Sequence, residues 1–237
     1  MRYLFAITNI FLFINLFGQT TTIIYCFPGQ GSDKRIFDSL EIDPNYEIRV
    51  IEYGAPDKHM TMNSFARQLS AQIDTTKDFV LMGVSLGGMI CVELAEMLNP
   101  KRTIIISSAK NRNELPGSYK FQRAIPLYKV FPGCILVGGA KILQPLVEPD
   151  RNKNKETFKS MLGSKKGVYM KRTVGLLINW ERENNTKPIC HIHGTNDHTL
   201  PFRKIKQPTY TIDQGSHMMT LTRAKEISSI LNSVLAR

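Results

Sequence analysis

Short apolar runs alternate with longer amphipathic stretches from residue 21 onward. The runs have the length and the β-branched or aromatic content of buried strands, and they span residues 21–27, 47–53, 78–83, 103–107, 188–193 and 208–213. Apolar side chains repeat at the helical period in residues 62–73, 86–98 and 222–235. Strands that alternate with helices predict βαβ units, and therefore an α/β fold with a mostly parallel sheet flanked by helices. Ligands of such sheets bind at the carboxyl ends of the strands.

The alternation is interrupted between the apolar runs that end at residue 107 and begin at residue 188. There, Gly, Pro and basic residues separate short helical patches, of which residues 172–180 have the most helical pattern. We expect a helical cap inserted at about residues 110–185, after the strand at residues 103–107. A chain of 237 residues is near the upper limit of one hydrophobic core, which favours one domain with an insertion over two domains.

The first 18 residues have the pattern of a secretory signal peptide. Arg2 gives a short positive start, and residues 3–17 are largely apolar. This stretch is shorter than the roughly 20 residues of a spanning helix, and Gly18-Gln19 offers a cleavage site. We therefore expect residues 1–18 to be removed, leaving the α/β domain at residues 19–237 in a secreted or periplasmic protein. A retained membrane anchor is the alternative.

The junction between the strand at residues 78–83 and the helix at residues 86–98 reads Gly83-Val84-Ser85-Leu86-Gly87. This is the nucleophile-elbow pattern, in which a sharp turn exposes the serine at the end of a strand. Glycines two residues before and after the serine avoid clashes with the strained backbone. We predict that Ser85 is a catalytic nucleophile. A glycine-rich turn without chemistry is the alternative interpretation.

A serine hydroxyl needs a base about 3 Å away and an acid that orients the base. Of the five histidines, His217 alone follows the last strand in a polar loop before the final helix, so we predict that it is the base. Asp197 follows the preceding strand and lies between nucleophile and base in chain order, which predicts the acid. Glu114, after the fourth strand, is the alternative acid. Asp213 is disfavoured because it lies too near His217 along a strand end.

Backbone N–H donors are also needed where an oxyanion forms. The first strand ends in the loop Phe27-Pro28-Gly29-Gln30-Gly31, whose glycines allow a close backbone approach. We predict that the N–H groups of Gln30 and Leu86 form the oxyanion hole. An ordinary glycine-rich turn is the alternative, and phosphate binding is disfavoured because no GxGxxG or Walker pattern is present.

Other chemistries have weaker support in the sequence. His191, His193, Asp197 and His198 could be metal ligands, but the first two alternate along a predicted strand, so we expect no metal and no cofactor. No CxxC pair exists. Cys26, Cys91 and Cys190 lie in apolar runs or a helical pattern, and Cys134 lies beside Pro132-Gly133, which predicts buried free thiols.

The formal net charge of +11 is concentrated in the predicted cap. Residues 110–172 contain 14 Lys and Arg but 4 Asp and Glu, a net charge of 14 − 4 = +10. A solvated surface explains this excess, and attraction to anionic lipid, an anionic substrate or the cell surface is the alternative. Aromatic residues among these cations could suggest a nucleic-acid surface. We expect no nucleic-acid partner, because their loose spacing is typical of cap core.

Together these motifs resemble the α/β-hydrolase family over nearly all of residues 21–237. The resemblance rests on Pro28-Gly29-Gln30-Gly31, the elbow at Ser85, the loop from His193 to Asp197, and Gly215-Ser216-His217. It implies a sheet with an inserted cap and, as the commonest chemistry, hydrolysis of an ester or thioester with a small-molecule acyl group. Pro28 departs from the family, which often has His there. A non-catalytic binding protein on this scaffold, a serine peptidase and a carbon–carbon hydrolase remain alternatives.

Overall fold

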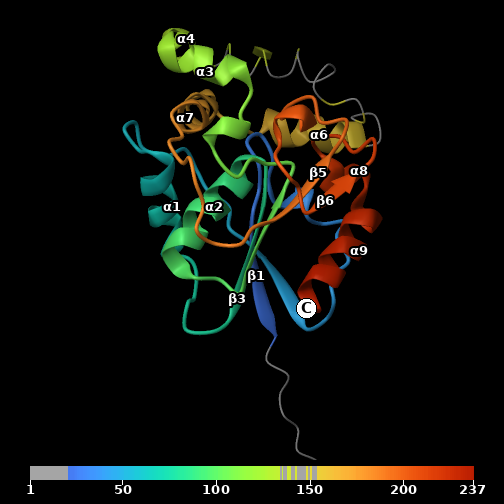
Figure 1. Cartoon of the computed structure of the whole chain (residues 1–237). Coiled ribbons are helices and arrows are strands. Elements are labelled where there is room, and N and C mark those ends of the chain that lie inside the picture. Colours follow the sequence, from blue (N-terminus) through green and yellow to red (C-terminus); the bar gives the residue numbers. More distant parts are fainter. Residues whose placement is uncertain are drawn as a thin grey trace, which may run out of the picture.

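The computed structural model of the chain describes residues 21–133, 135, 138–139, 142, 148, 150 and 154–237 (Figure 1). The predicted signal peptide at residues 1–18 and Cys134 lie outside the described residues. In the part described, no helix has the length and the apolar character needed to cross a membrane.

A six-stranded sheet forms the centre of the molecule, with the strand order β2-β1-β3-β4-β5-β6. All neighbouring strands are parallel, which confirms the predicted α/β sheet. The strands are β1 (Thr22–Phe27), β2 (Tyr46–Val50), β3 (Phe79–Val84), β4 (Arg102–Ile106), β5 (Cys190–Gly194) and β6 (Tyr210–Ile212).

Helices cover both faces of this sheet (Figure 1). One face carries α1 (Met62–Ser70) and α2 (Leu86–Leu98), and the other carries α9 (Ala224–Leu235) with the short α8 (Met219–Thr222). Three 3₁₀ helices occur in the described loops: η1 (Lys34–Ile36), η2 (Arg112–Glu114) and η4 (Phe202–Lys204). Thr61 begins α1 with a reciprocal capping box, since its Oγ1 accepts from the Ser64 N–H at 3.1 Å and Ser64 Oγ accepts from the Thr61 N–H at 2.9 Å.

Successive strand residues alternate between two hydrophobic cores. In β3, for example, Phe79 and Leu81 pack with α1 and α2, whereas Val80 and Met82 pack on the α9 side. The central strands are therefore apolar on both faces, as expected for a parallel sheet with helices on each side. Cys26 and Cys91 are buried free thiols, as predicted, whereas Cys190 is free but only partly buried.

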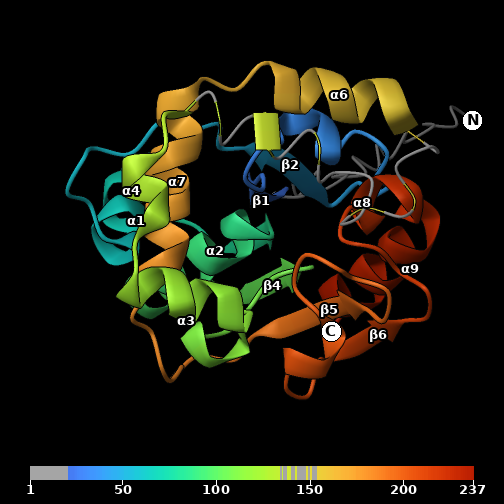
Figure 2. The same cartoon turned by 90° about the horizontal axis from the view of Figure 1, so that it is seen from above.

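The segment between β4 and β5 adds the inserted helices that the sequence predicts. Those whose bounds the structure describes are α3 (Gly117–Ala124), α4 (Leu127–Val130), α6 (Lys155–Gly163) and α7 (Gly167–Ile178). Seen from above, α6 lies along one side of the strands, and α3, α4 and α7 lie along an adjacent side (Figure 2). We call these four helices the cap. The most helical patch expected at residues 172–180 is found in α7, but α7 begins five residues earlier because Tyr169 and Met170 are buried in the cap.

One buried carboxylate links the segment that follows α7 to the core helices α1 and α2. Glu93 of α2 accepts from Arg182 Nε at 2.8 Å and Nη2 at 2.9 Å, from Trp180 Nε1 at 2.8 Å, and from Asn63 Nδ2 at 2.9 Å. Burial raises the pKa of Glu93, but the hydrogen bonds from these three side chains outweigh it and lower the pKa. The ionised carboxylate therefore holds the end of the cap against α2.

Candidate functional site

The strand order creates a crevice at the carboxyl ends of β1 and β3. These strands are neighbours, but the chain leaves β1 toward β2 at one side and leaves β3 toward β4 at the other. The two following connections diverge, so a crevice opens between them, which is the usual ligand position in open α/β sheets. The loop of residues 28–31 follows β1, and Ser85 follows β3.

Ser85 lies in a strained turn between β3 and α2. Its φ of 54° and ψ of −121° are rare for a residue with a side chain and cost about 1–3 kcal/mol. The neighbouring glycines make the turn possible. A Cβ on Gly87 would lie 1.9 Å from the carbonyl oxygen of Phe27, and a Cβ on Gly83 would lie 2.3 Å from that of Gly87. The turn leaves Ser85 partly exposed between buried residues on both sides.

Three predicted side chains from separate loops form one hydrogen-bonded series. Nε2 of His217 lies 2.9 Å from Oγ of Ser85, and Nδ1 of His217 lies 2.7 Å from Oδ2 of Asp197. Oδ1 of Asp197 accepts from the N–H groups of Thr199 at 2.9 Å and Leu200 at 2.8 Å, which fixes the carboxylate. With the Nδ1 proton donated to Asp197, Nε2 is free to accept the proton of Ser85.

The electrostatic surroundings of His217 favour its protonated form. Burial alone lowers the pKa of this imidazole, but the charge of Asp197, the hydrogen bond to it and the charge of Glu148 together raise the pKa above 6.5. An imidazolium that forms during a reaction is therefore stabilised in place.

The two residues predicted to supply an oxyanion hole lie close to Ser85, since Gln30 lines the same cavity and Leu86 follows Ser85 in the chain. Leu86 is the first residue of α2, so its N–H has no acceptor within the helix. The loop of residues 28–31 approaches Ser85 closely, since a Cβ on Gly29 would lie 3.1 Å from the Cβ of Ser85. The side chain of Gln30 donates to Thr173 Oγ1 of α7 at 2.7 Å, which ties this loop to the cap.

A cavity of about 280 Å³ opens above Ser85 and His217. Its walls are largely apolar side chains from the cap helices and from the loops of the sheet edge, including Tyr119, Phe158, Met161, Leu162, Met170, Leu177, Leu200 and Met218. Gln30, Thr199 and Glu148 add polar groups to the wall. Ligand pockets in proteins range from about 300 to 1,000 Å³, so this cavity fits a small ligand.

Glu148 borders the cavity, and the sequence pattern gave no expectation for it. It is 3% exposed, and its Oε2 accepts from the N–H of Met218, next to His217, at 3.2 Å. Burial raises the pKa of Glu148, and the charge of Asp197 adds to this, while contacts with Ser216 and His217 oppose it. One feature of the sequence sets it apart: no other acidic residue occurs between Glu114 and Glu148.

The other candidate residues have structural contacts of their own. The alternative acid, Glu114, is fully buried and accepts from the N–H groups of Lys110 at 2.6 Å and Lys206 at 3.0 Å, which joins the loop after β4 to the loop before β6. Asp213 accepts from Thr195 Oγ1 at 3.2 Å.

The histidines considered as metal ligands are also hydrogen-bonded. Nε2 of His191 lies 3.2 Å from Nδ1 of His193, and Nε2 of His193 lies 2.9 Å from the carbonyl oxygen of Leu200. Among the described residues, no group of three or more His, Cys, Asp or Glu side chains is arranged to hold a metal ion.

Residues 8–230 match the family model described as the alpha/beta hydrolase family. A comparison with curated proteins found no match. The fold is also similar to that of solved structures, among them a thermophilic esterase from Thermogutta terrifontis. The two are 16% identical with a TM-score of 0.67, and the match covers 92% of this chain and 90% of the esterase.

Two further solved structures have a similar fold. A lipase-esterase related protein from Clostridium acetobutylicum is 14% identical with a TM-score of 0.66, and the match covers 91% of this chain and 95% of that one. An N-acyl homoserine lactone degrading enzyme is 16% identical with a TM-score of 0.63, covering 90% of this chain and 92% of that one. At these identities the likeness shows the fold alone.

Proposed function

Because the chain belongs to the alpha/beta hydrolase family, we propose that it is a serine hydrolase that cleaves a small carboxylic ester or thioester. The hydrogen-bonded series from Asp197 through His217 to Ser85 is the observation that carries this proposal. Two solved structures with the same fold are described as an esterase and a lactone-degrading enzyme, and a lactone is a cyclic ester.

In this reaction His217 is the general base and Ser85 the nucleophile. Nε2 of His217 takes the hydroxyl proton as Oγ of Ser85 bonds to the acyl carbon, and the carbonyl oxygen becomes an oxyanion. The N–H groups of Gln30 and Leu86 donate to this oxyanion. Asp197 stabilises the imidazolium that forms, without taking its proton.

The reaction then proceeds in two stages, formation of an acyl-enzyme on Ser85 and its hydrolysis. The bond from the acyl carbon to the alcohol or thiol breaks, and His217 gives its proton to the leaving group. Water next attacks the acyl group on Ser85 while His217 removes a proton from it. Release of the carboxylic acid returns that proton to Ser85 and restores the free enzyme.

The size and lining of the cavity support an acyl group that is small and apolar. Met161, Met170 and Leu177 of the cap face the same cavity as Ser85. A long acyl chain or a folded peptide would exceed about 280 Å³ unless the cap moved. The substrate that fits best is therefore a short acyl ester.

The test is intact-mass spectrometry before and after treatment with a fluorophosphonate, with Ser85→Ala as the control. We expect one adduct on the wild type and none on Ser85→Ala, followed by hydrolysis of short p-nitrophenyl esters by the wild type alone. No adduct on a folded wild type would favour a non-catalytic binding protein on this scaffold. An adduct without ester or thioester turnover would favour a serine peptidase or a carbon–carbon hydrolase.

We also propose that the protein acts outside the cytoplasm after removal of residues 1–18. The apolar stretch at residues 3–17, its positive start and the small residue Gly18 support this proposal. The mass of the protein recovered from its native host tests it: a mature N-terminus at Gln19 is expected, and an intact Met1 would contradict it.

A further inference from the structure

The outer face of the cap collects the exposed apolar side chains of the molecule. In the described part of the chain, every exposed large apolar side chain belongs to residues 121–168. Six of them lie on α3, on α4, directly after these two helices, or at the start of α7, and we call them the cap face: Phe121, Ile125, Leu127, Val130, Phe131 and Val168. Val130 is 79% exposed and Phe121 55%, so these are outward-pointing side chains. Apolar patches of this kind mark interaction sites.

These residues are brought together because α3 and α4 both pack on α7. Tyr128 fixes α4 there, since its hydroxyl accepts from Asn179 Nδ2 at 2.9 Å and its ring lies beside Gly175. At the other end of α4, the backbones of Gly133 and Gly167 are in contact. With Tyr128 turned inward, Leu127, Val130 and Phe131 are left on the outside.

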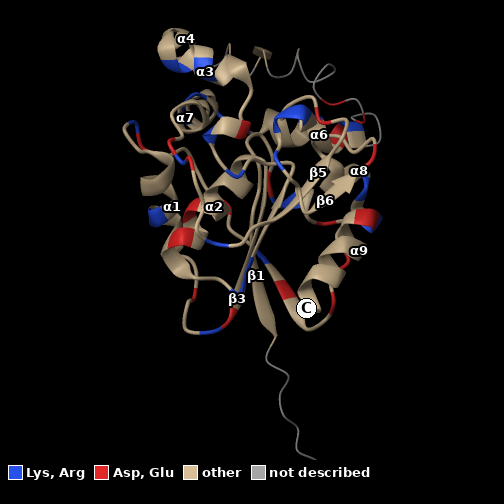
Figure 3. Ribbon diagram, viewed as in Figure 1, with Lys and Arg blue, Asp and Glu red and all other residues tan. Residues whose placement is uncertain are grey.

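The charged side chains of α3 and α4 are all basic, although Arg123 is paired with Glu181, which follows α7. Residues 115–147 contain Lys120, Arg123, Lys129 and Lys141 and no Asp or Glu. Figure 3 shows basic and no acidic positions on α3 and α4, the layer of the molecule farthest from the sheet. Lys120 and Lys129 are exposed beside the apolar side chains. Apolar side chains interleaved with Lys and Arg, without carboxylates, are typical of helices that lie at an anionic membrane surface.

We propose that the cap face binds the surface of a membrane that contains anionic phospholipid. The lipid phosphates pair with Lys120 and Lys129, and the exposed apolar side chains enter the boundary between headgroups and acyl chains. A second copy of the chain is a poor occupant, because two such faces would bring cations against cations. Tyr119 at the start of α3 lines the cavity above Ser85, so α3 contributes to both the acyl site and the bound face.

Vesicle sedimentation of the full chain tests this proposal. Phosphatidylcholine vesicles are compared with vesicles that also contain phosphatidylglycerol, and all variants carry the same N-terminus. We expect the wild type to bind the anionic vesicles, to release them as salt is raised, and to bind phosphatidylcholine far more weakly. Equal binding to both vesicles, or to neither, would overturn the proposal.

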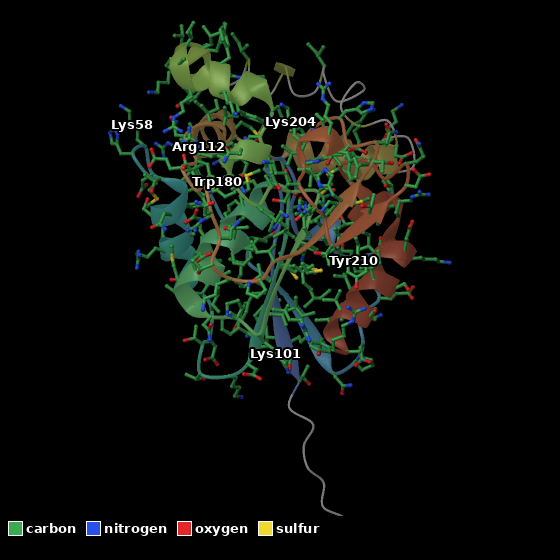
Figure 4. All side chains as sticks on the ribbon, viewed as in Figure 1. Lys58, Lys101, Arg112, Trp180, Lys204 and Tyr210 are labelled. Carbon is green, nitrogen blue, oxygen red and sulfur yellow. The ribbon has the colours of Figure 1, made fainter. Side chains whose placement is uncertain are left out.

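Two double variants distinguish the effect of the cap face on vesicle binding from the effect of net charge. Lys120→Glu with Lys129→Glu is expected to weaken binding by about thirtyfold or more, since each cation near the surface contributes about fivefold. Lys77→Glu with Lys101→Glu changes the net charge equally at the opposite end of the molecule, where Figure 4 shows Lys101. That control should bind within about threefold of wild type, with the difference set by screened long-range charge. Equal losses in the two variants would overturn the proposal.

A third double variant tests the apolar part. Phe121→Asn with Val130→Asn should weaken binding by about tenfold or more, while thermal unfolding and hydrolysis of a soluble ester stay unchanged. Unchanged vesicle binding would overturn the proposal. If this variant instead converted a dimer to a monomer in light scattering, the face would belong to a second copy of the chain. If the wild type did not bind vesicles but bound an acidic protein, the cap face would be a binding site for that protein.

Discussion

Nε2 of His217 lies 2.9 Å from Oγ of Ser85, although 132 residues separate them in sequence. The sheet brings them together. Ser85 follows β3 and His217 follows β6, and β4 and β5 lie between these two strands in the sheet. All four strands are parallel, so the loops after them reach the same edge. The cap is inserted between β4 and β5, so it accounts for part of the sequence separation between the two residues.

Replacement of Asp197 by Asn should remove activity while preserving the fold. The amide can still accept from Thr199 and Leu200, but it cannot hold His217 in the tautomer that leaves Nε2 unprotonated. We expect kcat to fall by about 10⁴-fold with little change in thermal stability. Steady-state kinetics on a p-nitrophenyl ester measure this. Glu114→Gln is the matched control for the alternative acid, and a comparable loss of kcat there with a normal fold would contradict the assignment.

The pH profile of kcat/KM should show an acidic limb set by His217. Burial lowers the pKa of this residue, but Asp197 and Glu148 raise it more, so the net shift is upward from 6.5. The base must be neutral to accept a proton, so activity should fall as the pH falls through a midpoint above about 6.5.

Glu148→Gln should move that limb to lower pH. The variant removes one of the charges that raise the pKa of His217, so the imidazole should stay neutral to a lower pH. Asp150→Asn is a control with the same change in net charge two residues away. A limb that stays in place in Glu148→Gln, or that moves equally in both variants, would show that Glu148 does not act on His217.

Loss of Arg182 should destabilise the protein strongly. Arg182→Ala leaves the Glu93 carboxylate, 3% exposed, without its cationic partner, which costs about 3–5 kcal/mol of unfolding free energy. The folded pKa of Glu93 is lowered from 4.5, so the stabilisation is present above pH 4.5 and is lost as the pH falls through the folded pKa.

Urea denaturation at pH 7 measures this loss. Arg123→Ala is the control, because it breaks a pair with Glu181 that is exposed, and such pairs contribute about 0–1 kcal/mol. Equal effects of the two variants would mean that the buried network around Glu93 does not fasten the cap.

The elbow should not tolerate a methyl group at residue 87. In Gly87→Ala the new Cβ would lie 1.9 Å from the carbonyl oxygen of Phe27, so α2 would have to move away from β1. We expect a loss of at least about 3 kcal/mol, measured by chemical denaturation. Gly54→Ala places its Cβ where no atom lies within 4 Å and should be nearly neutral. A folded Gly87→Ala of normal stability would contradict the packing at the elbow.

The sequence alone determined the features that repeat locally or that depend on chain order. Apolar periods predicted the parallel sheet, α2 from Leu86 to Leu98 and the inserted helices, because burial on a strand or helix face leaves a pattern within a few residues. The elbow glycines pointed to Ser85. The positions of His217 and Asp197 after the last two strands were enough to suggest that their side chains would meet at one sheet edge.

Only the tertiary structure decided which distant residues are neighbours. Glu148 lies beside His217, Glu93 lies beside Arg182, and the cap face of α3 and α4 is exposed rather than packed into the cap. Nothing in the local pattern distinguishes Val130, which is exposed, from Leu177, which is buried. Whether such a side chain is buried depends on which helix packs against it, and that contact is set by the whole fold rather than by nearby residues.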